Sequence, residues 1–332
     1  MLRILHDTNI DFIGRWRIAA GILTAFLVPG VIWIAISGFR TGIEFTGGTL
    51  VQLAFTNPPK VAAVRDAARQ TVGDVEVQTF GSPRDIVVRA QERHHVERQG
   101  QGATSVASQI ESALARRFGA TAFKVVRSEA IGPRVGAELR RNATIAMLIS
   151  FVVSLIYLAI RFEWRFGLAA VLANIHDIIA TFAFIKYTQI EITLFVVGGI
   201  LTVIGYSLSD TVVVFDRVRE LLRQGARVPM RDTLNRAVNE TLPRTVMTGT
   251  TVVACLIALV VFGGAVLRPF ALVLLFGILV GTMSSIYVAS PLLYWIERKW
   301  PRQGGESKGT IRALAADRQR QARVEKDTAG AR

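Results

Sequence analysis

Two carboxylates interrupt stretches that are otherwise almost free of charge. Asp177 lies within the apolar residues 166–185, and Asp210 lies within residues 192–215. A carboxylate in hydrocarbon costs at least about 2.5–3.5 kcal/mol on insertion scales, so each must be protonated, paired or hydrated. A carboxyl group that alternates between such surroundings takes up and releases a proton. These two acids are therefore the candidates for chemistry, and that chemistry is proton transfer.

The residues around Asp210 favour this interpretation. On a helix, Tyr206 and Ser207 lie one turn before Asp210 on the same face, so a phenol and a hydroxyl adjoin the carboxylate. Asp210 lies six residues before Asp216, about 9 Å along the helix from a cluster of charges. Arg244 is most simply an anchor at the membrane surface, although its side chain is long enough to extend toward Asp210. The structural alternative is a permanent hydrogen bond from Asp210 that ties two helices together.

His176 and Asp177 form a candidate second polar cluster. Asp177 lies ten residues after Gly167, about 15 Å along a helix and close to the middle of a membrane. Adjacent residues on a helix point about 100° apart. We therefore expect that the two side chains do not form a tight dyad by themselves, and that one of them bonds a neighbouring helix. A structural and a functional role are equally open for this pair.

The stretches that hold these residues are long enough to cross a membrane. A hydrocarbon layer about 30 Å thick requires about 20 apolar residues of helix. Four further windows contain no Asp, Glu, Lys or Arg, namely residues 18–39, 142–160, 245–267 and 269–296. Together with the two stretches that each hold one acid, they predict six transmembrane helices.

The composition agrees with a membrane protein. Of the 332 residues, 51% are hydrophobic, and the formal net charge is +14. This apolar excess disfavours an ordinary cytosolic enzyme. A single Cys excludes an internal disulfide framework and a Cys-rich metal cluster. Because the basic residues gather at the ends of the spans, the net charge reflects topology and disfavours binding of nucleic acid.

Positive charge also predicts the orientation in the membrane. The links between the second and third spans and between the fourth and fifth spans are rich in Arg, whereas the opposite links carry only Lys186 and Arg268. Both termini are then cytoplasmic. The predicted organisation is a cytoplasmic N-terminus (1–17), a first transmembrane helix (18–39), an external domain (40–141), five further transmembrane helices (142–296) and a basic cytoplasmic tail (297–332). The tail is expected to lie near anionic lipid head groups, with a ribosome or nascent-chain contact as the alternative.

The external domain has the pattern of a small α+β fold. Strand-like residues 49–55, 75–80, 85–89 and 122–127 alternate with helical residues 60–72 and 104–118. That order, β-α-β-β-α-β, is ferredoxin-like. The loop pair His94 and His95 has no third ligand at a suitable spacing, so we expect no metal site there.

Five motifs resemble those of one family, the SecF subunits of the bacterial Sec protein-export machinery, which is related to the resistance-nodulation-division transporters. They are GIEFTGGT at 42–49, IGPRVG at 131–136, GYSLSDTVVVFDR at 205–217, NETLPRT at 239–245 and GTMSSI at 281–286. Three positions differ from the family pattern: Glu44 replaces Asp, Ser209 replaces Asn and Met283 replaces Tyr. Ser209 adjoins the key carboxylate and changes the hydrogen bonding available there, but the titrating group is kept.

The resemblance implies a non-enzymatic subunit of the inner membrane that pairs with SecD, each contributing half of a pseudosymmetric twelve-helix bundle. It implies coupling of proton flow to late, ATP-independent steps of preprotein export, in contact with the Sec channel and the preprotein. By position, Asp210 is the proton-relay carboxylate and Arg244 its cationic neighbour, with Tyr206 and Ser207 beside them. The motif that opens the external domain contributes Gly42, Glu44, Gly47 and Gly48. No cofactor is implied, and no phosphate-binding glycine loop is found.

Two other classes of protein remain as alternatives. A proton-driven small-molecule exporter would use the same intramembrane carboxylate, but its usual large external domains are missing. An intramembrane aspartyl protease would use Asp177 and Asp210, but its G-x-G-D motif is absent because residues 205–210 read GYSLSD. A serine protease is disfavoured because His176 is the one intramembrane His and no nucleophile elbow is found.

Overall fold

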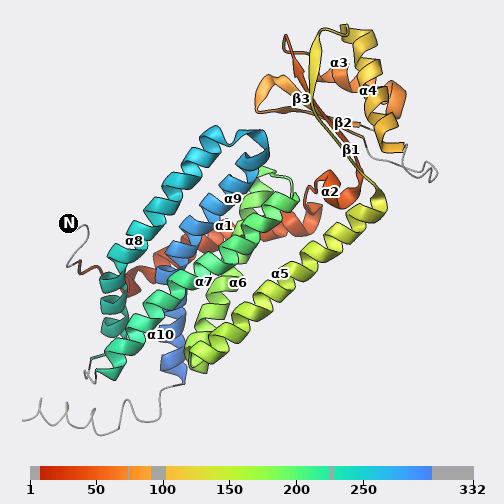
Figure 1. Ribbon diagram of the computed structural model, residues 1–332. Coiled ribbons are helices and arrows are strands. Elements are labelled where there is room, and N and C mark those ends of the chain that lie inside the picture. Colours follow the sequence, from red (N-terminus) through yellow and green to blue (C-terminus); the bar gives the residue numbers. More distant parts are fainter. Residues whose placement is uncertain (1–7, 74, 91–101, 225–227, 301–332) are drawn as a thin grey trace, which may run out of the picture.

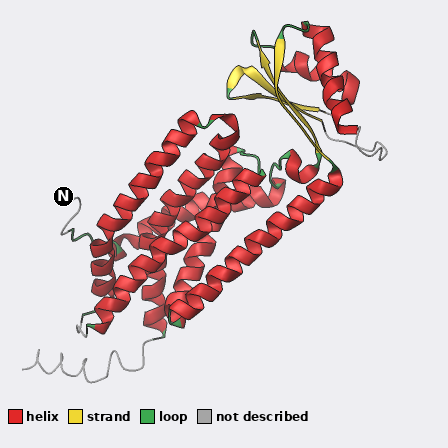
Figure 2. Ribbon diagram, viewed as in Figure 1, coloured by secondary structure: helices red, strands yellow, loops and turns green. Residues whose placement is uncertain are grey.

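The computed structural model describes residues 8–73, 75–90, 102–224 and 228–300. Long helices form a bundle, and a small sheet with its own two helices lies beyond one end of it (Figures 1 and 2). His94 and His95 lie outside the described residues.

Within those residues, six helical segments are long and apolar enough to span a membrane. The bundle consists of α1 (Trp16–Ser37), preceded by η1 (Ile13–Arg15), together with α5 (Pro133–Arg161), α6 (Trp164–Thr188), α7 (Leu194–Arg223), α8 (Met230–Phe262) and α9 (Gly264–Ser284). The last span continues through a π-helical turn, η2 (Ser285–Ala289), into α10 (Ser290–Lys299). The predicted class of polytopic helical membrane protein is confirmed.

The helix ends differ from the limits of the charge-free windows. α5 begins at Pro133 rather than near residue 142, because a helix continues through charged residues once it leaves hydrocarbon. The fifth span was expected to reach residue 267, but α8 ends at Phe262. Gly263 and Gly264 turn the chain there, and Gly264 has a φ of +67°, which favours glycine.

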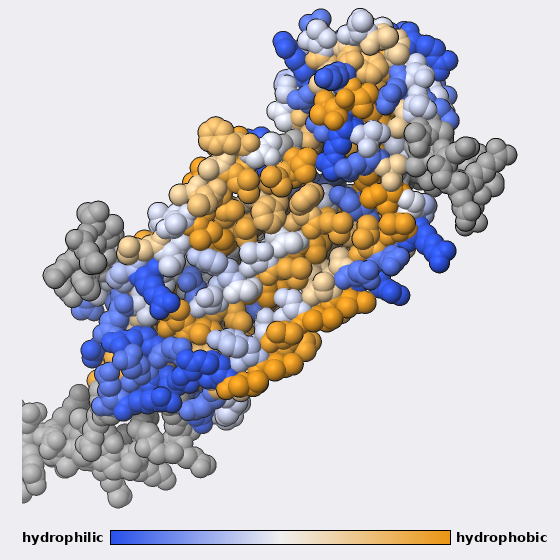
Figure 3. Space-filling model, in the orientation of Figure 1, coloured by the Kyte–Doolittle hydropathy of each residue, from blue (hydrophilic) through white to orange (hydrophobic). Residues whose placement is uncertain are grey.

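The bundle has an inner and an outer layer. α6, α7 and α9 bury about half of their most apolar windows, whereas α1, α5 and α8 bury fewer than one residue in five. The outer helices present apolar side chains along the length of the bundle, and polar side chains gather at the end remote from the sheet (Figure 3). Such exposed apolar faces are suited to lipid or to another apolar helix.

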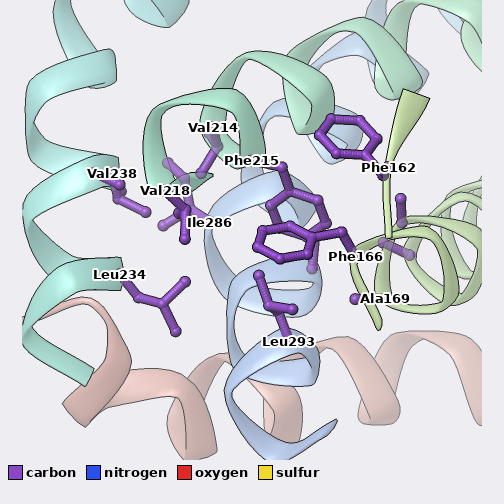
Figure 4. Packing of buried hydrophobic residues seen from close by; sticks show 14 of the residues in the cluster. Phe162, Phe166, Ala169, Val214, Phe215, Val218, Leu234, Val238, Ile286 and Leu293 are labelled. Carbon is purple, nitrogen blue, oxygen red and sulfur yellow. The ribbon is translucent and has the colours of Figure 1, made fainter. Parts of the chain in front are cut away.

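The largest core lies at that remote end. Three aromatic rings meet there, from Phe162 in the link between α5 and α6, Phe166 on α6 and Phe215 on α7. Phe215 lies 5.4 Å from Phe166 and 6.2 Å from Phe162 between ring centroids, both edge-on (Figure 4). Leu293 of α10 and Leu234 of α8 belong to the same cluster. This core joins the remote ends of these five helices.

The sheet domain (residues 48–131) follows a short helix, α2 (Ile43–Thr46). Its elements are β1 (Gly48–Phe55), α3 (Val61–Val72), β2 (Val75–Phe80), β3 (Ser82–Ala90), α4 (Gly102–Phe118) and β4 (Phe123–Ile131). The strand order is β2-β3-β1-β4 with every neighbouring pair antiparallel. Each helix connects two strands that have a third strand between them, which is the predicted ferredoxin-like arrangement.

Candidate functional site

The two intramembrane acids lie on the inner helices. Asp177 on α6 is 1% exposed, and Asp210 on α7 is 7% exposed. α7 packs against α6, α8 and α9, so that three helices can offer partners to these carboxylates. Each carboxylate has its own set of contacts.

Asp210 is held by α9. Thr282 Oγ1 donates a hydrogen bond of 2.9 Å to Asp210 Oδ2. Sequence reasoning missed Thr282 as a partner, although it belongs to the motif at 281–286 that carried the family resemblance. The preceding residue, Gly281, allows this contact, because a Cβ there would lie only 3.2 Å from Ser207 Cα on α7.

Ser207 contacts the other acid. Its hydroxyl donates to Asp177 Oδ2 on α6, so the residue expected beside Asp210 joins the second polar cluster. Tyr206 faces the Thr248 side chain on α8 and makes no hydrogen bond with Asp210 among the described residues. Tyr206, Ser207 and Asp210 thus lie on one face of α7 as expected, but the two hydroxyl groups contact different helices.

His176 and Asp177 do form a dyad, which corrects our expectation. His176 Nδ1 lies 2.9 Å from Asp177 Oδ1. Rotation about the side-chain bonds brings the imidazole over the neighbouring carboxylate despite the angle between the two Cβ directions. The other part of the expectation is confirmed, because Asp177 also bonds Ser207 on the neighbouring helix.

Arg244 on α8 lies within coulombic range of Asp210 without a direct contact. In the described part of the chain, no hydrogen bond or ion pair joins these two residues, and Arg244 is exposed. It lines a cavity of about 1350 Å³ between α7, α8 and residues 8–11, at the end of the bundle remote from the sheet. Val213, one turn after Asp210, also lines this cavity. The polar cavity therefore approaches Asp210 to within one helical turn.

The motif at 42–49 positions the sheet domain on the bundle. Gly47 has a φ of +73°, and a Cβ there would lie 2.8 Å from Pro133 Cα at the start of α5. A Cβ at Gly136 would lie 2.9 Å from Gly47 N, so two of the five motifs pack directly against each other. Gly48, which has a φ of +133°, begins β1. Only glycine combines these φ values with so close an approach.

Glu44 and Gly42 lie where the sheet domain meets the loop between α6 and α7. Gly42 N donates to Ile192 O at 2.9 Å. Burial raises the pKa of the Glu44 carboxyl above its ordinary value. Glu44 lines a cavity of about 200 Å³ whose walls also include Arg89 and Glu191.

An ion pair connects the sheet domain to the same loop. Arg89 on β3 pairs with Glu191, and each side chain is 15% exposed. Ile192 N donates to Arg40 O at 2.9 Å, which adds main-chain pairing beside the ion pair. The loop joins α6 to α7, so the sheet domain contacts the connection between the two helices that carry the buried acids.

The geometry does not favour an aspartyl protease. In such an enzyme two carboxyl groups share a proton. In the described residues, Asp177 bonds His176 and Ser207 while Asp210 bonds Thr282, and no hydrogen bond joins the two acids. No group of three or more potential metal ligands occurs in the described part of the chain.

Known proteins are similar to this chain over most of its length. The family model for the C-terminal part of the SecD/SecF protein export membrane proteins matches residues 110–299, and the SecD/SecF GG motif matches residues 32–59. Protein translocase subunit SecF of Gemmatimonas aurantiaca is 50% identical over 95% of both chains. The corresponding subunit of Magnetococcus marinus is 45% identical over 87% of this chain and 92% of the relative.

A solved structure from the same group of proteins has a fold similar to that of this chain. The crystal structure of SecDF, a translocon-associated membrane protein from Thermus thermophilus, matches with a TM-score of 0.79 and 32% identity. The match covers 90% of this chain and 40% of the SecDF chain, so this chain spans two fifths of that protein.

Fold and site thus define a multi-pass membrane protein with buried acids on its inner helices and a ferredoxin-like domain at one end. The chain belongs to the SecF family of protein translocase subunits within the SecD/SecF proteins.

Proposed function

We propose that this chain is the SecF-type accessory subunit of a Sec translocase and couples proton flow to late, ATP-independent steps of preprotein export. The observation that carries the proposal is Asp210, a buried carboxylate on an inner helix, bonded by Thr282 and one turn from a polar cavity that Arg244 lines. A buried acid next to hydrated space and a cation has two environments in which to hold or release a proton.

The relay works by exchange between these environments. With a proton, Asp210 is neutral and remains against α9, bonded to Thr282. Without it, the carboxylate is stabilised by the water of the cavity and by Arg244, whose long side chain can extend toward it. Because α7 and α8 line that cavity together, ionisation of Asp210 favours a different separation of these two helices. Tyr206 faces Thr248 on α8, so a different separation of α7 and α8 would alter the surroundings of its phenol.

The driving force is sufficient for such a change. One elementary charge that crosses 100 mV releases about 2.3 kcal/mol, which shifts a two-state equilibrium about fiftyfold. The contacts of the sheet domain with the loop between α6 and α7 transmit the change, since Glu191 and Ile192 lie directly between the two helices. The sheet domain is then the part that acts on the emerging preprotein.

Partners and topology follow from the same proposal. The exposed apolar faces of the outer helices fit lipid and a second six-helix half, which SecD would supply in a pseudosymmetric complex. The complex would associate with the Sec channel in the bacterial inner membrane. On this proposal, both termini and the large cavity face the cytoplasm, the basic tail lies close to anionic lipids, and the sheet domain lies outside. No cofactor, nucleotide hydrolysis or binding of nucleic acid is part of the mechanism.

Export into inverted membrane vesicles tests the relay. Asp210→Asn keeps the shape of the side chain and removes its charge, so we expect proton-driven stimulation of export to be lost while ATP-driven translocation and binding of SecD persist. Glu138→Gln is the matched control, because it neutralises an exposed acid near the start of α5. Full stimulation in the Asp210→Asn vesicles would overturn the proposal. Failure of the tagged chain to recover SecD would overturn the proposed complex.

A further inference from the structure

His176, Asp177 and Ser207 make a closed set of contacts inside the bundle. Asp177 Oδ1 lies 2.9 Å from His176 Nδ1, and Asp177 Oδ2 accepts a hydrogen bond from Ser207 Oγ. The Asp177 side chain is 1% exposed and that of His176 15%. Both carboxylate oxygens therefore have a partner, and one of those partners is itself a base.

The second ring nitrogen of His176 distinguishes this set from a simple tie between helices. No described residue lies in hydrogen-bonding geometry with His176 Nε2, which is shielded from solvent. When Nδ1–H donates to the Asp177 carboxylate, Nε2 carries a lone pair and the set has one net negative charge. A proton added at Nε2 makes the set neutral and places an imidazolium against the carboxylate. Because net charge is costly in a low dielectric, the set is suited to bind one proton.

Asp210 lies three residues after Ser207 on α7, so it is the acid that follows this set most closely on that helix. α6 packs against α1, α5, α7, α9, η2 and α10. Away from the charged helix ends, the ionisable side chains of these described elements are Tyr157 on α5, Tyr206 and Asp210 on α7, Tyr287 on η2 and Tyr294 on α10, while α1 and α9 carry Arg17 and Arg268 near their starts. Among these groups of the described elements, Asp210 is the one carboxylic acid, and a carboxylic acid ionises far more readily than the phenol of a tyrosine.

We propose that His176, Asp177 and Ser207 form a second proton-binding site whose occupancy controls when Asp210 ionises. Ser207 lies one turn before Asp210 on α7. Because Ser207 bonds the Asp177 carboxylate, Asp177 and Asp210 lie beside the same turn of α7. Two ionised carboxylates in adjacent sites repel each other, so a proton held at the second site allows Asp210 to release its own. The inference rests on the proposed function of Asp210 and adds a second, coupled site to it.

The protonation of His176 can be measured directly in the intact complex. The chain contains four His residues. Replacing His6, His94 and His95 leaves His176 as the single labelled imidazole when ¹⁵N-histidine is incorporated and unlabelled SecD is added in lipid. We expect the NMR signals of the ring to report a change of protonation state when the pH is varied, and Asp210→Asn to alter the pH dependence of those signals. A ring that keeps one protonation state throughout, or a pH dependence that is the same with and without the Asp210 carboxylate, would overturn the second site.

Export gives an independent readout with a matched pair of variants. Ser207→Ala and Thr181→Val each remove one buried hydroxyl, but Ser207 bonds the Asp177 carboxylate whereas Thr181 bonds the Asp177 main-chain oxygen at 2.8 Å. We expect the pH profile of proton-driven export to contain a step where the second site gains or loses its proton. Asp177→Asn and Ser207→Ala should remove that step, and Thr181→Val should keep it. If Asp210→Asn abolishes stimulation while Asp177→Asn and Ser207→Ala keep the wild-type profile, the second site is refuted and the relay at Asp210 stands. If Asp210→Asn keeps stimulation, both proposals fall.

Discussion

Replacement of Gly281 by Ala tests how α9 holds Asp210. A Cβ at this position would lie 3.0 Å from Ser207 Cβ and 3.2 Å from Ser207 Cα on α7. Carbon atoms pack at about 3.5–4.0 Å, so the two helices must move apart locally by roughly 0.3–1 Å. Because one of the two atoms belongs to the backbone, a change of rotamer does not relieve the contact. Overpacking of this kind costs about 1–3 kcal/mol of stability.

The separation also affects the site, since Thr282 directly follows Gly281. Its hydrogen bond to Asp210 is 2.9 Å long, and a displacement of half an ångström or more would carry it past the usual limit of about 3.0 Å for two oxygens. A hydrogen bond between neutral groups contributes about 0.5–1.5 kcal/mol, and 1.4 kcal/mol corresponds to a factor of ten. Since Asp210 is neutral in the state that Thr282 holds, we expect Gly281→Ala to lower the unfolding temperature and to reduce proton-driven export by about two- to tenfold.

Two further variants separate the steric effect from the loss of the hydrogen bond. Thr282→Val removes the donor without a clash, so export should fall while the helix packing is kept. Gly205→Ala on α7 adds the same methyl group where no atom beyond its chain neighbours and the backbone of its own helix lies within 4 Å, and the gain in helix propensity should raise stability by about 0.5–1 kcal/mol. Thermal unfolding in detergent and export into inverted vesicles are the two measurements. If Gly281→Ala behaves like Gly205→Ala in both assays, the reasoning about the contact between α7 and α9 is wrong.

Two predictions concern the junction of the sheet domain with the bundle. Burial raises the pKa of Glu44 above its ordinary 4.5, so its contribution to stability is present in acid and is lost as the pH rises through the raised value. Glu44→Gln should remove this loss of stability, so the unfolding temperature of the variant should fall less between about pH 4 and 8 than that of the wild type. The same slope of unfolding temperature against pH in both proteins would contradict the prediction. For Arg89 and Glu191, substitution of each by Gln alone and together should reveal a coupling free energy of about 0.5–3 kcal/mol in unfolding. Strictly additive effects would show that the ion pair does not join the two parts.

The membrane-spanning class was predictable because hydrocarbon imposes a length and a composition on every span. The same constraint identified Asp177 and Asp210, since an acid in such a stretch stands out against its surroundings. The order of strands and helices in the sheet domain was predictable from the spacing of apolar residues, because they recur every two residues in a strand and every 3.6 residues in a helix. Helix ends were not predictable in this way. α5 continues through charged residues, and the turn at Gly263 and Gly264 depends on backbone conformation rather than hydropathy.

The sequence by itself determined which residues are buried acids and which residues share a face of their helix. Only the tertiary structure decided what each face meets. Ser207 and Asp210 lie on one face, yet Ser207 bonds Asp177 of α6 and Asp210 bonds Thr282 of α9. The physical reason is that helical periodicity fixes directions within one helix, whereas the partner depends on how closely two helices approach. That approach is set by contacts distant in sequence, here by Gly281 against Ser207.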